Sequence, residues 1–390
     1  MNCKRFVKIA AALFAAMTIC ASAFSFDFGG SVSDSTSFKG NKFSSLKLDQ
    51  INDLTLWFKT PITKDGKIYF VAEGLYEFEY DGSVEKAFNR LDLDLLKVAG
   101  TISLGQNYLN FSAGRFIYSD LTGLIFSQNG DGAYASFDAS RFSVSAYAAY
   151  TGLLNANFAK MLNHPNDPFS FDRDLVYDLA QKYIVTSATF ALPRLAKSHN
   201  LAAQFFGAFK VEGNSYNRMF LTASIDGPIY KTLYYKAFSS FELHAYDGGS
   251  MDFSNMSSAK VTWFLPFKSA TLDLGVLYAS GNNGPFDPFR AVTKIDVSNS
   301  LAEPQHSGVI KNSFAASIKP LQNLLVYAGC DLLIDASTSS LGYKGFQYRL
   351  GADWQIFSDL RAGASCLQYF DNDNSDYDKV QIALNASITF

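Results

Sequence analysis

Charged side chains recur at alternate positions of the sequence, where they share one face of an extended strand. In GFQYRLGADW, residues 345–354, Arg349 and Asp353 fall on one face, whereas Phe346 and Leu350 fall on the other. Charges gathered around a water-filled passage attract or repel small ions, and a ring of one sign sets ion preference. The acidic candidates are Glu73, Glu77, Asp92, Asp94, Glu242, Asp273 and Asp353, and the basic candidates are Arg90, Lys210, Lys236, Lys260, Arg349 and Arg361.

These charges do not by themselves predict which ion is preferred, because the two signs are nearly balanced. The simplest interpretation of each residue is a solvated side chain or a cross-strand ion pair. The formal charge of the chain is −3, and it becomes −6 without the three basic residues of its first 23 positions. This excess of acid favours cations weakly and argues against a nucleic-acid-binding protein.

Catalytic and metal-binding motifs are missing from the sequence. No GxSxG, HExxH or CxxC occurs, and the four histidines are scattered at 164, 199, 244 and 306. Cys330 and Cys366 are expected on apolar faces of strands that are not neighbours, and two cysteines do not make a disulfide framework. The sequence therefore predicts no enzyme, no cofactor and no metal site.

Strict alternation of apolar residues with small or polar ones runs along nearly the whole chain. In KVQIALNASITF, residues 379–390, every second residue from Val380 to Phe390 is apolar. A period of two is typical of β-strands, because successive side chains point to opposite faces of a sheet. The alternation predicts strands at 25–34, 51–61, 67–80, 89–98, 106–117, 131–138, 141–151, 182–194, 198–212, 216–226, 231–246, 252–265, 270–281, 308–318, 321–335, 343–355, 358–370 and 379–390.

The connections between these runs alternate in length, with short ones after even-numbered strands. The long ones are expected at 35–50, 118–130, 152–181 and 282–307. Short turns on one side of a sheet and long loops on the other are typical of transmembrane β-barrels, in which every backbone polar group finds a partner. The sequence therefore predicts an all-β fold, a transmembrane antiparallel up-and-down β-barrel of about 18 strands. The second choice is 16 strands, again with short periplasmic turns and long extracellular loops.

The first residues resemble a secretory signal peptide. A basic segment precedes the apolar run IAAALFAAMTI, residues 9–19, and the small residues ASA at 21–23 favour cleavage between Ala23 and Phe24. The alternative is a lipoprotein signal with Cys20 as the lipidated residue, which the bulky preceding isoleucine disfavours. We therefore expect a signal peptide at 1–23 and a single barrel domain at 24–390.

The last strand resembles the assembly signal of Gram-negative outer-membrane proteins. It ends on the aromatic Phe390, with Ile388 two residues earlier and apolar residues at alternate positions before it. This resemblance implies outer-membrane lipid around the barrel, and it implies the barrel-assembly machinery and periplasmic chaperones as partners during biogenesis. The alternative is an ordinary soluble strand that ends in phenylalanine.

A further pair of candidates lies in AGRFIYSDLTGLIFSQNGDGAYASF, residues 113–137. Arg115 ends one predicted strand and Asp131 opens the next, and turn formation alone explains the Asp and Gly residues between them. The hairpin resembles the GR…DG hairpin of large alginate-export-type porins. If the connection at 118–130 folds inward, Arg115 and Asp131 are expected near a constriction.

The two longest connections have features of their own. In DRDLVYDLAQKY, residues 172–183, Leu175, Leu179 and Tyr183 have helical spacing, which predicts a short amphipathic helix that caps or plugs the barrel. The connection at 282–307 contains three Pro and two Phe and is expected to be an ordered extracellular loop.

A barrel of 16 to 18 strands encloses an aqueous channel. We therefore expect a porin for passive diffusion of small hydrophilic solutes or ions, with a homo-oligomer left open. One alternative is a substrate-specific transporter for a saccharide or hydrophobic ligand, and another is a surface interaction protein that uses the barrel as a scaffold.

Aromatic residues at strand ends are typical of interfacial girdles. Candidates for sugar stacking inside the barrel are Tyr147, Tyr234, Tyr327 and Tyr369.

Overall fold

The structure is a computed structural model of the 390-residue chain. It describes residues 26–164, 167–195, 198–282, 286–294, 301, 307–337, 341–373 and 375–390. The expected signal peptide, with its cleavage site between Ala23 and Phe24, lies outside these residues. In the described residues, no helix has the length and apolar character needed to cross a membrane.

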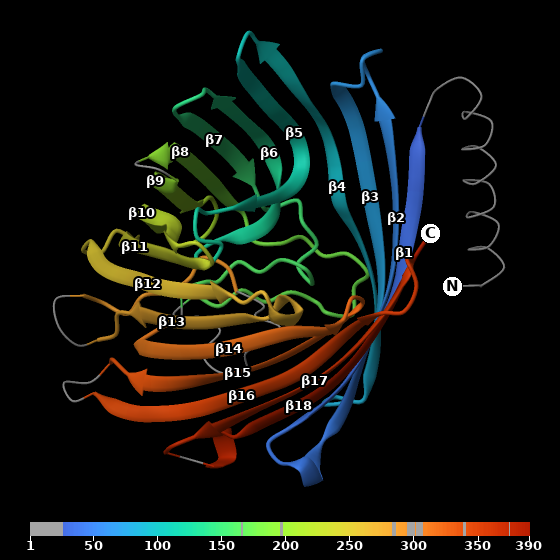
Figure 1. Cartoon of the computed structure of the whole chain (residues 1–390), viewed down its shortest axis with the longest axis vertical. Helices are drawn as coiled ribbons and strands as arrows, with labels where there is room; N and C mark the ends of the chain where they lie inside the picture. The colour runs from blue at the N-terminus through green and yellow to red at the C-terminus, as the bar shows by residue number, and fades with distance from the viewer. Residues whose placement is uncertain are drawn as a thin grey trace.

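Eighteen antiparallel strands form one sheet that closes on itself (Figure 1). Each strand pairs with the next one along the chain, and β1 pairs with both β2 and β18. The prediction of 18 strands is confirmed, and the number 16 is not needed. The strands are β1 Asp27–Gly40, β2 Lys47–Pro61, β3 Ile68–Asp81, β4 Lys86–Leu104, β5 Asn107–Ser119, β6 Ser127–Asp138, β7 Ser143–Tyr150, β8 Tyr183–Leu195, β9 His199–Lys210, β10 Tyr216–Tyr230, β11 Leu233–Tyr246, β12 Asp252–Phe264, β13 Thr271–Ala279, β14 Val309–Leu321, β15 Leu324–Asp335, β16 Gly342–Gln355, β17 Leu360–Asp371 and β18 Lys379–Thr389. The described residues also contain three short 3-10 helices, η1 Phe43–Ser45, η2 Phe267–Ser269 and η3 Ser375–Tyr377.

The last strand closes the barrel against the first. β1 and β18 pair from Ser31 opposite Thr389 to Gly40 opposite Val380. Phe390 extends this ladder, because its amide donates to the Gly30 carbonyl at 3.0 Å and its carbonyl accepts from the Gly30 amide at 2.9 Å. The sheet therefore has no free edge at the seam, as a barrel in lipid requires.

The two faces of the sheet differ in polarity, as the alternation predicts. Large apolar side chains such as Leu350 and Leu384 are about half exposed on the outer face, at 53% and 51%. Cys330 and Cys366 share that face, because they pair with Phe314 and Leu350 respectively. Both are free thiols, and they lie on β15 and β17, which are separated by β16.

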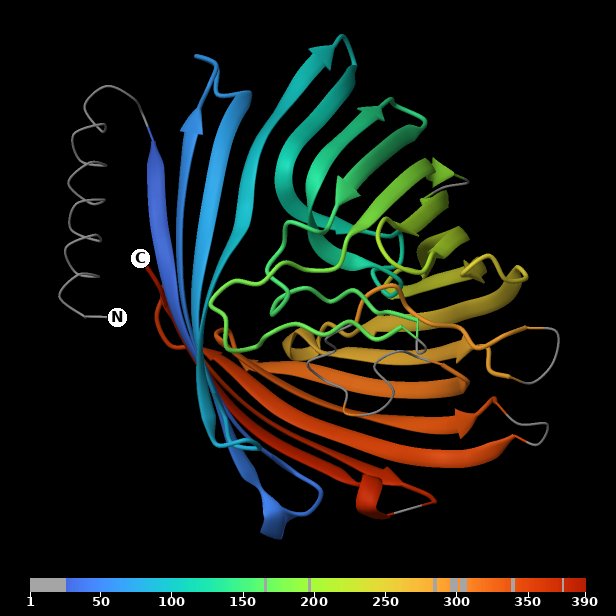
Figure 2. The ribbon, with the colours of Figure 1, turned by 180° about the vertical axis from the view of Figure 1, so that it is seen from behind.

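The interior of the barrel contains a hydrophobic core. Its members come from the inner face of the wall and from two connections, β5–β6 and β13–β14, that fold inward. The β7–β8 connection, drawn in green, also runs inside the barrel (Figure 2). The connections thus fill part of the lumen. Core residues include Phe116, Tyr118, Ile125, Phe126, Tyr183, Phe206, Phe220, Phe289 and Val292.

Two predictions about the connections are wrong. Residues 172–183 contain no helix, because the backbone of Asp178 and Ala180 pairs with that of Ala156 and Leu154 instead of with its own preceding turn. The long loop at 35–50 is also absent. There β1 continues to Gly40 and β2 begins at Lys47, since residues 35–39 still pair with residues 47–51. The other long connections lie near their expected ends, at 120–126, 151–182 and 280–308.

Candidate functional site

A bend in the hairpin of β5 and β6 shapes the interior beside β4. The strands β4 and β5 pair only from Leu96 opposite Arg115 to Leu104 opposite Asn107. At the bend Gly114 has φ +123° and faces Gly132 across the hairpin. A Cβ on Gly114 would lie 2.1 Å from the Leu96 carbonyl oxygen, so only glycine fits there. Beyond this point β5 parts from β4.

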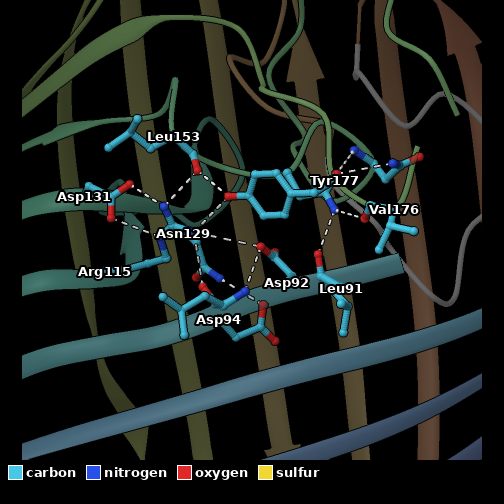
Figure 3. A network of polar contacts seen from close by, with 12 residues as sticks. Leu91, Asp92, Asp94, Arg115, Asn129, Asp131, Leu153, Val176 and Tyr177 are labelled. Carbon is cyan, nitrogen blue, oxygen red and sulfur yellow. Dashed lines mark hydrogen bonds and ion pairs between the residues drawn. The ribbon is translucent and has the colours of Figure 1, made fainter. Parts of the chain in front are cut away.

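Arg115 fastens the bent hairpin to the β7–β8 connection (Figure 3). Its guanidinium makes a bidentate pair with Asp131, at 2.9 Å and 2.8 Å. It also donates to the Leu153 carbonyl at 2.8 Å and contacts the hydroxyl of Tyr177 at 3.4 Å. Asp92 of β4 lies 3.9 Å away. Because a guanidinium fork is rigid, this arrangement fixes the β5–β6 hairpin, the β7–β8 connection and β4 relative to one another.

The inner face of β2, β3 and β4 carries a patch of carboxylates. In the part of the chain that the structure describes, Asp53, Glu73 and Asp94 make no ion pair with a basic side chain. Ser33 donates to Asp53 at 3.2 Å, and Asn129 approaches Asp94 at 3.5 Å. We call Asp53, Glu73 and Asp94 the acidic patch.

Other predicted residues of the same wall form ion pairs. Arg90 of β4 donates to Glu77 of β3 at 2.6 Å and also pairs with Glu79. Arg173 of the β7–β8 connection contacts Glu79 at 3.6 Å and Asp81 at 3.3 Å. These pairs hold the connection against the inner wall. Seven predicted residues thus lie on neighbouring strands of this wall, namely Glu73, Glu77, Arg90, Asp92, Asp94, Arg115 and Asp131.

The remaining predicted residues are spread over the rest of the wall. Lys210 pairs with Asp167 of the β7–β8 connection, and Asp273 pairs with Lys260 at 3.1 Å. Arg349 pairs with Asp331 at 2.8 Å, whereas Arg361 donates to the Gln355 side chain at 3.3 Å. Lys236 lies directly opposite Lys260, and Asp353 lies opposite Gly363. These residues do not converge with the acidic patch, and their role as pore-lining groups stays a prediction.

A buried ion pair between the predicted residue Glu242 and Arg218, which sequence reasoning missed, holds the β13–β14 connection inside the barrel. Arg218 and Glu242 are each 1% exposed, with the Arg218 Nε atom 2.7 Å from Glu242. Arg218 also donates to the carbonyls of Ala291, at 2.9 Å, and of Arg290. The signal was available, because Arg218 shares the inner face of a predicted strand with Tyr216 and Phe220.

The inward turn between β5 and β6 is organised by one buried carboxylate. Asp120 accepts hydrogen bonds from the amide and hydroxyl of Thr122 and from the amides of Ile125 and Phe126. Burial raises the pKa of Asp120, an effect larger than the opposing one of these hydrogen bonds. The Ile125 carbonyl in turn accepts from Val292 at 2.7 Å, which joins this turn to the β13–β14 connection.

The substitution Asp120→Ala is therefore expected to lower the free energy of unfolding by about 3 kcal/mol, because buried donors lose their acceptor. Denaturant unfolding of the folded barrel measures this loss. The matched control is Asp65→Ala, in the exposed turn between β2 and β3, where little change is expected. Equal effects of the two substitutions would contradict an organising role for Asp120.

Comparison with known proteins places the fold. No protein-family model matches the chain, and no curated protein does. Solved structures of proteins from Pseudomonas aeruginosa do match. One is the outer membrane protein OpdK, which is 10% identical to this chain and superposes with a TM-score of 0.62. The match covers 93% of this chain and 99% of OpdK. Another is OccK2 (OpdF), which is 12% identical and superposes with a TM-score of 0.64, and this match covers 94% of this chain and 98% of OccK2. The chain has the barrel fold of these two proteins. At such low identity the likeness establishes the fold and not the function.

Proposed function

We propose that the chain is an outer-membrane porin through which small hydrophilic solutes or ions diffuse passively. The observation that carries the proposal is the acidic patch, which lines a closed barrel whose outer face is apolar. A barrel of this strand number leaves an aqueous lumen, which the inward connections narrow. One structural neighbour, OpdK, is an outer membrane protein, which supports the same location for this chain. We propose no catalytic role.

The same proposal includes the route to the membrane. A signal peptide at 1–23 directs export, and the barrel-assembly machinery with periplasmic chaperones inserts the chain. Ile388 and Phe390 remain the candidate assembly signal, and both are exposed, at 42% on the last strand and at 67% directly after it. Whether the barrel forms a homo-oligomer is decided by its size in mild detergent.

The acidic patch predicts a preference for cations. Carboxylates without a basic partner at a constriction raise the local concentration of cations and repel anions. The triple substitution Asp53→Asn, Glu73→Gln and Asp94→Asn is therefore expected to lower the cation preference of the channel. The reversal potential across a salt gradient in a planar bilayer measures this preference directly.

The matched control for this triple substitution is Asp226→Asn and Asp273→Asn, which neutralises carboxylates on the opposite part of the wall. Asp226 contacts Asn200 at 2.8 Å, and Asp273 pairs with Lys260. We expect a smaller shift of the reversal potential than from the acidic patch. An equal or larger shift in the control would place the selectivity elsewhere in the barrel.

Selective transport of small carboxylates is a second candidate function. A cavity of about 800 Å³ is lined by Lys231, Lys236 and Lys260 together with Tyr234 and Phe264, whose rings meet edge to face at 5.5 Å. One structural neighbour is OpdK solved with vanillate, at 11% identity, a TM-score of 0.63 and coverage of 93% of this chain and 98% of its own. If this candidate is correct, vanillate lowers the ion current, and Lys236→Gln with Lys260→Gln abolishes that block.

A role as a surface interaction protein finds less support. The described parts of the β7–β8 and β13–β14 connections pack inside the barrel, where Leu154 of the first and Phe289 and Val292 of the second are fully or almost fully buried. Connections held in this way offer less surface to a partner outside the cell.

A further inference from the structure

The barrel wall has a place where two consecutive strands separate. β4 pairs with β3 from Lys86 to Gly100, but it pairs with β5 only from Leu96 onward. The preceding part of β4 therefore has no strand partner on its β5 side among the described residues. Figure 1 shows β5 curving away from β4, with the β7–β8 connection in the space between them. We call this place the β4–β5 opening.

Side chains and one loop carbonyl, and not the backbone of a neighbouring strand, satisfy the backbone of β4 at this opening (Figure 3). The Leu91 amide donates to the Val176 carbonyl at 3.2 Å, and the Leu91 carbonyl accepts from the Asn155 side chain at 2.8 Å. The Leu93 amide donates to the Asp92 side chain at 2.9 Å, and the Leu93 carbonyl contacts Arg115 at 3.4 Å. Lipid cannot supply such partners, so these few contacts close the wall in place of a ladder.

The part of the β7–β8 connection that lies over the opening is a small, separately packed unit, which we call the cover. Residues 154–156 and 178–180 pair through the Ala156 amide to the Asp178 carbonyl, at 2.7 Å, and the Ala180 amide to the Leu154 carbonyl, at 2.9 Å. Leu154, Ala156 and Ala180 form a hydrophobic cluster distinct from the main core. The cover can therefore move as one body once its contacts with β4 and Arg115, and the ion pairs of Arg173 with β3, are broken.

The two sides of the opening differ in chemistry. Exposed apolar side chains border it, with Leu91 48%, Ile117 64% and Val176 44% exposed. Behind them lie three carboxylates, Asp92, Asp94 and Asp131, and one guanidinium, that of Arg115. The opening thus joins an apolar rim to a polar site of negative charge.

We infer that the β4–β5 opening is a lateral passage between the lumen and the membrane for single-chain amphiphiles with a neutral or cationic head group. The tail lies against the apolar rim of Leu91, Ile117 and Val176, and the head group lies near Asp92 and Asp94. An anionic head group is disfavoured by the excess of carboxylates. Each additional methylene buried along the rim strengthens binding about fourfold. The inference rests on the outer-membrane location proposed above and does not require that ions pass through the lumen.

Photolabelling in lipid vesicles tests this passage without any need for an ion current. The probe is a dodecylamine with a photoreactive diazirine on its tail, and the labelled residues are mapped by peptide mass spectrometry. We expect labelling of the cover and of the inner face of β4. Dodecylamine is expected to compete with this labelling, and butylamine is not.

A reversible chemical cross-link across the opening provides the decisive comparison. Leu91→Cys and Val176→Cys, in a protein with Cys330→Ala and Cys366→Ala, are joined after folding by a short bifunctional thiol reagent. The matched control joins Leu350→Cys to Cys366, which are cross-strand partners on the outer face, in a protein with Cys330→Ala. We expect the cross-link between positions 91 and 176 to abolish labelling of the inner face of β4 and the control cross-link to leave this labelling intact. The proposed passage is overturned if labelling is confined to outward residues such as Leu384, or if the cross-link between positions 91 and 176 does not affect it.

Discussion

Replacement of Arg218 by leucine is expected to lower the free energy of unfolding by about 3–5 kcal/mol and to release the β13–β14 connection from the barrel interior. The substitution leaves Glu242 buried at 1% exposure, with Ser254 donating to it at 2.5 Å and the His244 ring nitrogen 3.6 Å away. The carbonyls of Arg290 and Ala291 lose their donor at the same time. Denaturant unfolding in detergent measures the loss, and protease cleavage within the connection reports its release.

The double variant Arg218→Leu and Glu242→Leu separates the two effects. Removal of both charges eliminates the uncompensated carboxylate, so most of the lost stability is expected to return. The two carbonyls remain without their donor, so the connection is expected to stay sensitive to protease. If the single variant unfolds at the same denaturant concentration as the natural protein, Arg218 does not hold this connection.

The substitution Arg115→Met has the second-largest expected effect, a loss of about 2–4 kcal/mol. It removes the bidentate partner of Asp131 and the donor to the Leu153 carbonyl. The loss is smaller than at Arg218 because the Asp131 side chain retains 27% exposure to solvent. The β7–β8 connection is then less firmly held, and the current through a single open channel is expected to fluctuate more.

The matched control for Arg115→Met is Arg141→Met, because Arg141 is an exposed arginine in the turn between β6 and β7. We expect neither its stability nor its current noise to change. Identical behaviour of the two variants would show that the Arg115 contacts do not organise the narrow part of the lumen.

The strands were predictable from the sequence because alternation is a local property. In β18 the apolar residues Leu384 and Ile388 are exposed on the outer face, at 51% and 42%, and the same alternation locates the other 17 strands. The helix predicted at 172–183 failed for the opposite reason. Its spacing of Leu175, Leu179 and Tyr183 suited a helix, but the backbone there pairs with residues 154–156, which no local pattern reveals.

The candidate site was predictable only in part. Strand alternation placed Asp92 and Asp94 on the inner face, and the inward position of Arg218 could have been found in the same way. The partners of these residues could not, because they come from distant connections. Arg115 reaches Tyr177, and Arg218 reaches Ala291, across 62 and 73 positions of the chain.

Single-channel recording of the folded protein in a planar bilayer tests the central claim most directly. The recording is made across a salt gradient, after the barrel has been shown to be folded by its heat-dependent mobility in gel electrophoresis. We predict discrete current steps and a reversal potential whose sign corresponds to cation preference. The absence of steps from a folded barrel would contradict a porin, and a reversal potential of the opposite sign would contradict control by Asp53, Glu73 and Asp94.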